Sequence, residues 1–253
     1  MSIDIGQKIN QLTKKMPEHT VVLSSWLKQQ GISDQLVKRY RSSQWLEPVG
    51  HGAYQRTGSP ATWMGALYAL QSQACAPVHA GGPTAFALHG RAHYIAPDLA
   101  QVWLFSPPTY RLPAWFARRQ WKPKPHLVRT AMLPLGIGLQ QYSAGSFSIT
   151  VSSSARAMME CLQLAPHRFS LMECYELMQN LPTLRVSSVQ QLLQSCASVK
   201  VVRLFMFMAE RAGHSWVDSI DRSRLDFGRG KRTLARDGVY NAKYQLVLPA
   251  ELA

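Results

Sequence analysis

The side chains with the clearest chemistry in this chain lie between residues 37 and 56, in the stretch VKRYRSSQWLEPVGHGAYQR. Lysine, arginine, glutamine and serine donate hydrogen bonds to base edges and to phosphate oxygens. The stretch combines a short basic helix with two apolar runs around Gly-His-Gly. The order helix, strand, reversal, strand is typical of a helix set in a DNA groove and steadied by a hairpin wing. The pattern predicts binding of double-stranded DNA.

Other constellations do not predict catalysis or metal binding. His89 and His93 stand four apart in HGRAH, but no glutamate follows His89, and Gly90 is expected to end the helix there. LDFGRGKRT (225–233) has Leu225 and Arg232 where a phosphate-binding loop needs glycine and a hydroxyl, so it predicts a basic turn. The chain contains no GxSxG, and its 14 acidic residues supply two-metal chemistry poorly. We expect no catalytic residue, no metal and no cofactor.

The cysteines and the hydropathy pattern indicate the compartment. Cys75, Cys161, Cys174 and Cys196 are too widely spaced for a CxxC site and have mostly apolar neighbours, which predicts buried free thiols. No apolar run approaches the roughly 18 residues of a membrane span, and the N-terminus lacks the apolar middle of a secretory signal. The sequence therefore predicts a soluble, cytoplasmic protein.

The charge balance favours a polyanionic partner. The chain has 28 Lys and Arg against 14 Asp and Glu, a net charge of +14. Neutralising phosphates releases condensed counterions, and this gain does not depend on base sequence. The excess is +4 over residues 1–75, +6 over 76–150 and +4 over 151–253, so a single basic tail does not explain it.

A second basic cluster lies between residues 111 and 129. It is interleaved with Trp115, Phe116 and Trp121, which either stack on bases and sugars or anchor the segment to the core. We expect it to extend a DNA footprint as an auxiliary basic patch. The members of this patch are Arg118, Arg119, Lys122 and Lys124.

Helix signals place the first cluster on a helix-turn-helix. Apolar spacing predicts a helix over 3–16, and a short second helix from Ser24 to Gln30 is closed by Gly31. Ser33 is a natural N-cap for a third helix that reaches about Ser43. At 100° per residue this helix turns Leu36, Val37 and Tyr40 to one side and its donors to the other.

Two strands follow, 45–49 and 53–56, and Gly50-His51-Gly52 is expected to supply the positive φ of the reversal. On the third helix, Gln35, Lys38 and Ser42 are expected to face base edges, with Arg39 and Arg41 on phosphates. The wing residues His51 and Arg56 are expected to reach the backbone or minor groove. With the N-cap, the predicted DNA-binding set is Ser33, Gln35, Lys38, Arg39, Arg41, Ser42, His51 and Arg56.

The rest of the chain alternates strand-like and helical segments. Strands are predicted at 102–108, 146–152 and 243–249, and helices at 61–74, 83–90, 154–164, 171–180, 189–196 and 199–212. Residues 118–125 are the most linker-like segment. We predict an α+β protein with a winged helix-turn-helix DNA-binding domain at 1–75 and a larger mixed α/β domain at 76–253.

Three blocks carry a resemblance to a known family. GISDQLVKRYRSSQWLEPVGHGAYQR (31–56) is similar to its helix, small-aromatic-Leu turn and Gly-x-Gly-x-Tyr wing, and HAGGPTAFALHG (79–90) to its Gly-Gly-x-Thr-Ala element. The third block is SVKVVRLFMFMAERAGHSW with LDFGRGKRTLARDGVYNAKYQLVLP. Together they resemble the AbiEi-like transcriptional regulators, antitoxins of type IV abortive-infection systems. Ser42-Ser43-Gln44 departs from the basic residues and glycine that are frequent there.

The resemblance implies an antitoxin C-terminal domain and a repressor that binds inverted repeats in its own promoter, as a dimer on DNA. It implies a nucleotidyltransferase-like toxin as functional partner, countered without a stable complex, and no catalysis by this chain. Two alternatives remain from the residues alone. One is a ligand-responsive winged-helix regulator unrelated to any toxin, and the other is an enzyme such as a nuclease.

Overall fold

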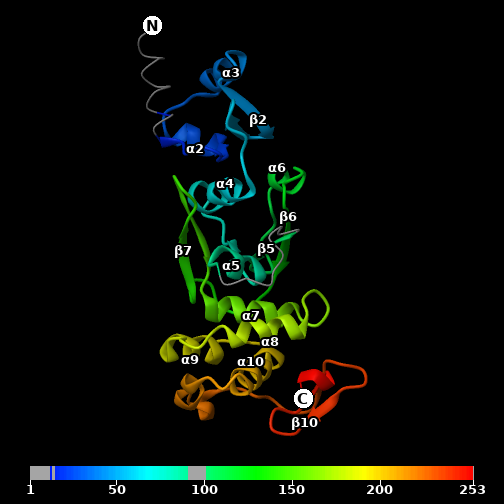
Figure 1. Cartoon of the computed structure of the whole chain (residues 1–253). Helices are drawn as coiled ribbons and strands as arrows, with labels where there is room; N and C mark the ends of the chain where they lie inside the picture. Colours follow the sequence, from blue (N-terminus) through cyan, green and yellow to red (C-terminus); the bar gives the residue numbers. More distant parts are fainter. Residues whose placement is uncertain (1–11, 13–14, 91–100, 253) are drawn as a thin grey trace. The chain divides into compact units, whose positions relative to one another are not determined.

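The computed structural model describes residue 12, residues 15–90 and residues 101–252 (Figure 1). The helix predicted over 3–16 lies largely outside these residues, as does His93. The chain divides into two compact units that alternate along the sequence. Unit 1 comprises Met1–His79, Ala100–Arg129 and Gln141–Thr150, and unit 2 the remaining segments. The predicted division into domains at 1–75 and 76–253 stays a prediction.

A winged helix-turn-helix forms the N-terminal part of unit 1, as predicted. Its strands β1, β3 and β2 pair antiparallel in that order, with Val22 opposite Tyr54 and Leu46 opposite Arg56. The two residues of β1 are too few to have a periodicity of their own, so this strand was not among the predicted elements. The elements are β1 (Val22–Leu23), α2 (Ser24–Gln29), α3 (Asp34–Ser42), β2 (Leu46–Gly50) and β3 (Ala53–Arg56).

The core of the winged helix joins every one of these elements except β3, whose Tyr54 packs against it half-buried. Val37 and Tyr40 of α3 are 5% and 0% exposed, in agreement with the predicted apolar face. The other buried members are Leu12, Met16, Val22, Leu27, Ile32 and Leu46. Since a nine-residue helix is marginal in water by itself, this burial is what holds α3 in place.

The helix predicted over 61–74 is α4 (Trp63–Tyr68) continued by a π-helical turn at Ala69–Gln73. A five-stranded sheet has the strand order β6-β5-β4-β8-β7. Its strands are β4 (His79–Ala80), β5 (Gln101–Ser106), β6 (Lys124–Arg129), β7 (Leu139–Ser143) and β8 (Ser148–Ser152). The predictions at 102–108 and 146–152 are thus confirmed within a few residues.

The linker predicted at 118–125 is wrong at its C-terminal end, because β6 begins at Lys124 and pairs parallel with β5. Pro125 lies within β6, and a proline is tolerated there because β6 is an edge strand of its sheet. The connection between β5 and β6 contains one short helix, α6 (Ala114–Ala117).

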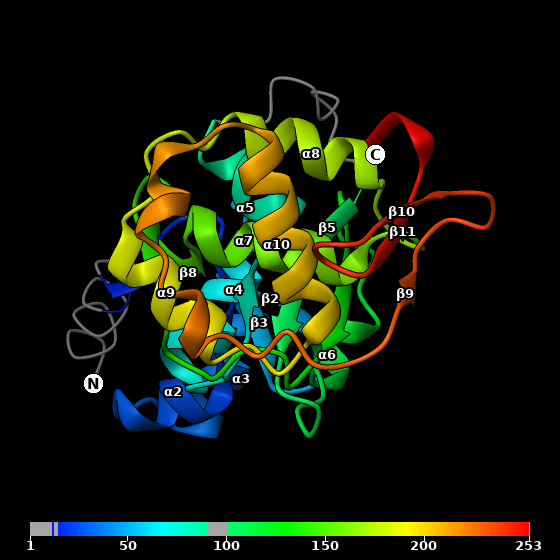
Figure 2. The ribbon, with the colours of Figure 1, turned by 90° about the horizontal axis from the view of Figure 1, so that it is seen from below.

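Unit 2 is built on helices, and Figure 2 shows α7, α8 and α10 in one view. They are α5 (Pro83–Leu88), α7 (Ser154–Leu164), α8 (Leu171–Gln179), α9 (Val186–Gln194) and α10 (Val199–Arg211). Each matches a predicted helix. Short 3₁₀ turns at Ser215–Ser219, Arg222–Arg224 and Ala250–Leu252 follow, with β9 (Arg232–Thr233), β10 (Val239–Asn241) and β11 (Leu246–Leu248). The strand predicted at 243–249 is therefore only three residues long.

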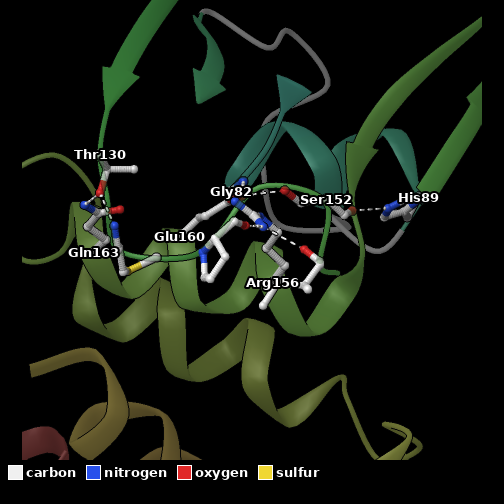
Figure 3. Close-up of polar contacts among 10 residues, drawn as sticks. Gly82, His89, Thr130, Ser152, Arg156, Glu160 and Gln163 are labelled. Atoms are coloured by element: carbon white, nitrogen blue, oxygen red, sulfur yellow. Dashed lines mark hydrogen bonds and ion pairs between the residues drawn. The ribbon is translucent and has the colours of Figure 1, made fainter. Parts of the chain in front are cut away.

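A buried ion pair lies on α7. Arg156 and Glu160, one helical turn apart, are 4% and 1% exposed, and Nε of Arg156 donates to Oε1 of Glu160 at 2.9 Å. Nη1 of Arg156 donates to the carbonyls of Pro134 and Ile137 at 2.9 and 2.6 Å. Figure 3 shows that Glu160 also receives the Ser152 hydroxyl and the Gly82 amide. The pair ties the loop at 134–137, the turn at Gly82 and the end of β8 to α7.

Breaking this pair from one side should be costly. Arg156→Met leaves the buried carboxylate of Glu160 without its cation, and we expect a loss of about 3 to 5 kcal/mol in the free energy of unfolding. The double variant Arg156→Met/Glu160→Met should lose less than the sum of the two single losses. Urea unfolding followed by circular dichroism measures both. Lys243→Met, which removes the exposed cation of the Lys243–Glu210 pair, is the control and should lose under about 1 kcal/mol.

Candidate nucleic-acid interface

The turn between α2 and α3 is fixed by capping at both helix ends. The amide of Gly31 donates to Lys28 O at 3.0 Å, and that of Ile32 donates to Leu27 O at 2.9 Å. With Gly31 at φ 78°, this is a Schellman end, so the glycine closes α2 as predicted. The Ser33 side chain accepts the Leu36 amide at 3.3 Å, which confirms it as the N-cap of α3.

A second Schellman motif ends α3 and leads directly into the wing. The amide of Gln44 donates to Arg41 O at 3.1 Å, and that of Trp45 donates to Tyr40 O at 2.8 Å. The rings of Tyr40 and Trp45 pack at 5.4 Å between centroids, which is the apolar contact that accompanies this motif. Gln44 has φ 55°, the left-handed conformation that favours glycine.

The donor face of α3 is turned away from the core. Gln35, Lys38, Arg39, Arg41 and Ser42 are all exposed, as is the capping residue before them. The Ser42 hydroxyl donates to Lys38 O at 3.1 Å within the helix. Part of this face, together with Glu47 and Pro48 of β2, lines a shallow hollow between α3 and the wing. The face has the predicted composition, and its contacts with DNA stay a prediction.

The wing reverses at Gly50-His51-Gly52, but the two glycines act differently. Gly52 has φ 69° and supplies the predicted positive φ, with His51 exposed beside it. Gly50 is not in the left-handed region, so within this tripeptide the positive φ comes from Gly52. A Cβ on Gly50 would lie 2.7 Å from Cβ of Trp115 and 2.9 Å from its Cα. Gly50 is required by this close approach of another segment.

Arg56 lies at the base of the wing, opposite Leu46 in the strand register, so it is far along β3 from the tip. It is half-buried, and its Nη1 lies 3.9 Å from Oε1 of Glu18. This placement separates it from His51, the other predicted wing contact. Its predicted contact with DNA is not tested by this geometry.

The aromatic residues of the second basic cluster are core residues. Trp115, Phe116 and Trp121 are 8%, 2% and 6% exposed, and Nε1 of Trp121 donates to Phe116 O at 2.9 Å. Of the two interpretations of these rings, the structure supports anchoring. Arg118, Lys122 and Lys124 are exposed, whereas Arg119 is half-buried and donates from Nη2 to Oε1 of Gln55 at 3.2 Å.

Gln55 is a residue of the interface region that the sequence analysis missed. It is 7% exposed and donates from Nε2 to Oε2 of Glu47 on the neighbouring strand at 3.1 Å. A signal was present, because the alternation along Ala53–Arg56 places Gln55 on the same face as the buried Ala53. A glutamine on the inner face of a strand indicates hydrogen-bond partners across the sheet.

The remaining constellations have structural explanations. In LDFGRGKRT, the buried Arg203 of α10 donates to Phe227 O at 2.6 Å and to Gly230 O at 2.7 Å. The segment is therefore a basic turn, as predicted, and Arg203 fixes its backbone. Nε2 of His89 lies 2.9 Å from Ser152 O. Among the residues that the structure describes, no three His, Cys, Asp or Glu side chains are grouped to hold a metal ion.

Three of the cysteines are buried free thiols, and burial raises the pKa of Cys161, Cys174 and Cys196 above the usual range of a thiol. The prediction is wrong for Cys75, which is exposed and follows the π-helical turn. Within the described ranges, no helix combines the length and the apolar character needed to cross a lipid bilayer.

These features define a protein of the winged-helix class, with a capped basic helix and a formed wing, followed by a larger α+β part. Comparison with family models matches residues 6–97 to the N-terminal domain of the AbiEi antitoxin, a transcriptional regulator, and residues 99–249 to the AbiEi antitoxin transcriptional regulator of type IV toxin–antitoxin systems. The two matches cover nearly the whole chain. This protein belongs to the AbiEi family of type IV antitoxin transcriptional regulators.

A solved structure shares the fold. The crystal structure of the Rv2827c protein from Mycobacterium tuberculosis aligns with a TM-score of 0.59 at 15% identity, over 94% of this chain and 89% of that one. No curated protein sequence matches the chain. At this identity the solved structure supports the fold alone.

A substitution at the C-terminal end of α3 should stabilise the helix without removing any of its hydrogen-bond donors. Gln44→Gly removes the Cβ from a left-handed position at the end of a helix, and we expect it to stabilise unit 1 by up to about 1 kcal/mol. Gln44→Ala is the matched control, because it removes the same side chain and keeps the Cβ. Thermal unfolding should show a higher midpoint for the glycine variant only. Equal midpoints for the two variants would contradict the role assigned to the backbone.

Proposed function

We propose that this chain is a DNA-binding antitoxin that represses its own operon by placing α3 in the major groove at inverted repeats of its promoter. The observation that supports this most is the exposure of the whole donor face of α3, on a helix capped at both ends and followed by a formed wing. In this proposal Gln35, Lys38 and Ser42 contact base edges and Arg39 and Arg41 contact phosphates.

Electrostatics favour the same face. Three cations within four residues of α3 repel one another, and a row of phosphates relieves that repulsion while it releases counterions. The exposed Arg118, Lys122 and Lys124 belong to the same unit as α3 and would extend the contact with the backbone. The tip residue His51 would reach the backbone or minor groove beside the recognition helix. Inverted repeats require two copies related by two-fold symmetry, so a dimer on DNA is part of the proposal.

The toxin partner is proposed as a nucleotidyltransferase-like protein encoded beside this chain and countered without a stable complex. Membership of the antitoxin family supports a toxin partner. We propose that the chain has no catalytic activity of its own and acts in the cytoplasm. Among the described residues, the grouped side chains that a metal-dependent nuclease needs do not occur.

Removing two cations from α3 should weaken promoter binding. For Lys38→Ala/Arg39→Ala we expect the binding free energy to weaken by about 1 to 3 kcal/mol for a lost base contact. The slope of log K against log salt should fall in magnitude by about one for each phosphate that is no longer neutralised. Fluorescence anisotropy with the promoter duplex at several salt concentrations measures both. Arg229→Ala/Lys231→Ala removes the same charge from exposed positions in the turn of unit 2 and is the control. Equal losses in the two double variants would show that net charge alone drives binding.

The antitoxin role separates from plain gene regulation in cells. Expression of the neighbouring gene alone should arrest growth, and co-expression of this chain from an unrelated promoter should relieve the arrest. Lys38→Ala/Arg39→Ala should still relieve it if neutralisation does not use the DNA-binding face. Absence of any arrest would favour a ligand-responsive regulator unrelated to a toxin.

A further inference from the structure

We propose that Arg119 and Gln55 are positioning residues that fix the wing against the segment between β5 and β6, and that Arg119 acts through this contact and not by touching DNA. The inference rests on the proposed DNA-binding function and refines it. It assigns Arg119 a part different from that of Arg118, Lys122 and Lys124. All the residues involved belong to unit 1.

The first observation is the close approach between β2 and α6. A Cβ at Gly50 would lie 2.7 Å from Cβ of Trp115 and 2.9 Å from its Cα, which is closer than real Cβ atoms approach. Gly50 of the wing therefore packs closely against Cβ and Cα of Trp115 in α6, with no room for a side chain at position 50. Neither Cα nor Cβ can move away by a change of side-chain rotamer, so this contact sets the spacing between the wing and α6.

The second observation is a hydrogen-bond chain that includes both strands of the wing. Oε1 of Gln55 accepts from Nη2 of Arg119 at 3.2 Å and from the Ala61 amide at 3.1 Å. Nε2 of Gln55 donates to Oε2 of Glu47, the residue opposite it in the strand register. Gln55 is 7% exposed, and hydrogen bonds with a charged partner are stronger than neutral ones. Arg119 thus reaches both strands through one buried amide.

The third observation is that Arg119 is itself held. Its Cζ lies 5.1 Å from the ring centroid of the buried Trp121, a cation–π distance. The planar guanidinium can stack on a ring and donate at its edge at the same time, which a lysine ammonium cannot do. Turning Arg119 toward a phosphate would break the contact with Trp121 and the hydrogen bond to Gln55 together.

These contacts have a consequence for binding. In its sheet the β2–β3 hairpin is extended by the two-residue strand β1 alone, which supports it little, so an unbraced wing would lose conformational entropy on binding DNA. A braced wing has lost that entropy already. Removal of the brace should therefore weaken binding and leave the number of neutralised phosphates unchanged, whereas removal of a phosphate contact lowers that number.

The test measures affinity and its salt dependence on a fluorescent duplex that covers the promoter of the chain's own gene. Arg119→Met and Gln55→Met should each weaken binding roughly three- to tenfold, and the double variant should be no weaker than the weaker-binding single variant. The slope of log K against log salt should stay at the wild-type value in all three. Arg39→Met calibrates the method, since removal of a phosphate contact reduces the magnitude of this negative slope by about 0.9.

Arg119→Lys gives a second, independent comparison. It keeps the charge and removes the planar fork, so the brace predicts binding as weak as that of Arg119→Met. A phosphate contact predicts binding close to wild type. Two results would overturn the inference. One is a salt slope whose magnitude drops in Arg119→Met as it does in Arg39→Met, and the other is near-wild-type binding by Arg119→Lys.

Hydrogen exchange on the free protein separates this inference from the proposed function. Arg119→Met should speed exchange of wing amides in 46–56 and leave α8 unchanged. Faster exchange without promoter binding by the wild type would mean that the brace exists and the proposed function fails. Promoter binding by the wild type with unchanged wing exchange would mean that the function stands and the brace does not.

Discussion

The burial of Val37 and Tyr40 beneath α3 is the constraint on which the interface depends. Lys38, Arg39 and Arg41 alternate with these two residues, and charged side chains of this kind do not enter a core without partners. Packing the two apolar side chains therefore fixes the rotation of the helix and leaves the donors on the outside. The Ser33 cap and the Schellman motif at Gln44 and Trp45 then fix its length. The arrangement of the cations follows from where the apolar residues go.

The sequence was sufficient to predict an element wherever the interactions that form it lie within a few residues of one another. The Ser33 cap, the closing glycine Gly31 and the helices of unit 2 follow from local signals, and the structure confirms them. The winged-helix order could be predicted because hairpin signals are also local. By contrast, β1 exists only because Val22 and Leu23 pair with residues thirty positions away. Its two residues have no periodicity to detect.

The same limit explains the errors around the wing. The glycine pair predicts the reversal locally, whereas the reason for a glycine at position 50 is Trp115, which lies far along the chain. The alternation along β3 marks Gln55 as inward-facing, but its partner Arg119 is 64 positions away and has no local signal. Proline and lysine in RRQWKPKP indicate a linker locally, and the pairing of β6 with β5 overrides that signal. Each error concerns a contact that the chain makes only after it folds.

Two of the blocks that resemble the family are explained by the scaffold of unit 2. In HAGGPTAFALHG, the Gly82 amide donates to the buried Glu160 at 2.9 Å, and Gly82 has φ 52°. In LDFGRGKRT, Arg203 holds the turn by its carbonyls, and a Cβ on Gly228 would lie 2.8 Å from Cγ2 of Val199. These glycines and charges hold loops in place. In the block that contains α3, Gln44 occupies a left-handed position where the backbone itself favours glycine.

In the proposed complex with DNA, the close packing of Gly50 against Trp115 of α6 also bears on how an operator is discriminated. A hairpin braced in this way would leave the duplex as the partner that deforms, and the cost of deforming DNA depends on base steps that no side chain touches. Flexible pyrimidine–purine steps under the tip would then be favoured over stiff A-tracts. Part of the selectivity of this protein would come from the stiffness of the DNA, and the alignment of natural operators should show preferences at positions without any contact.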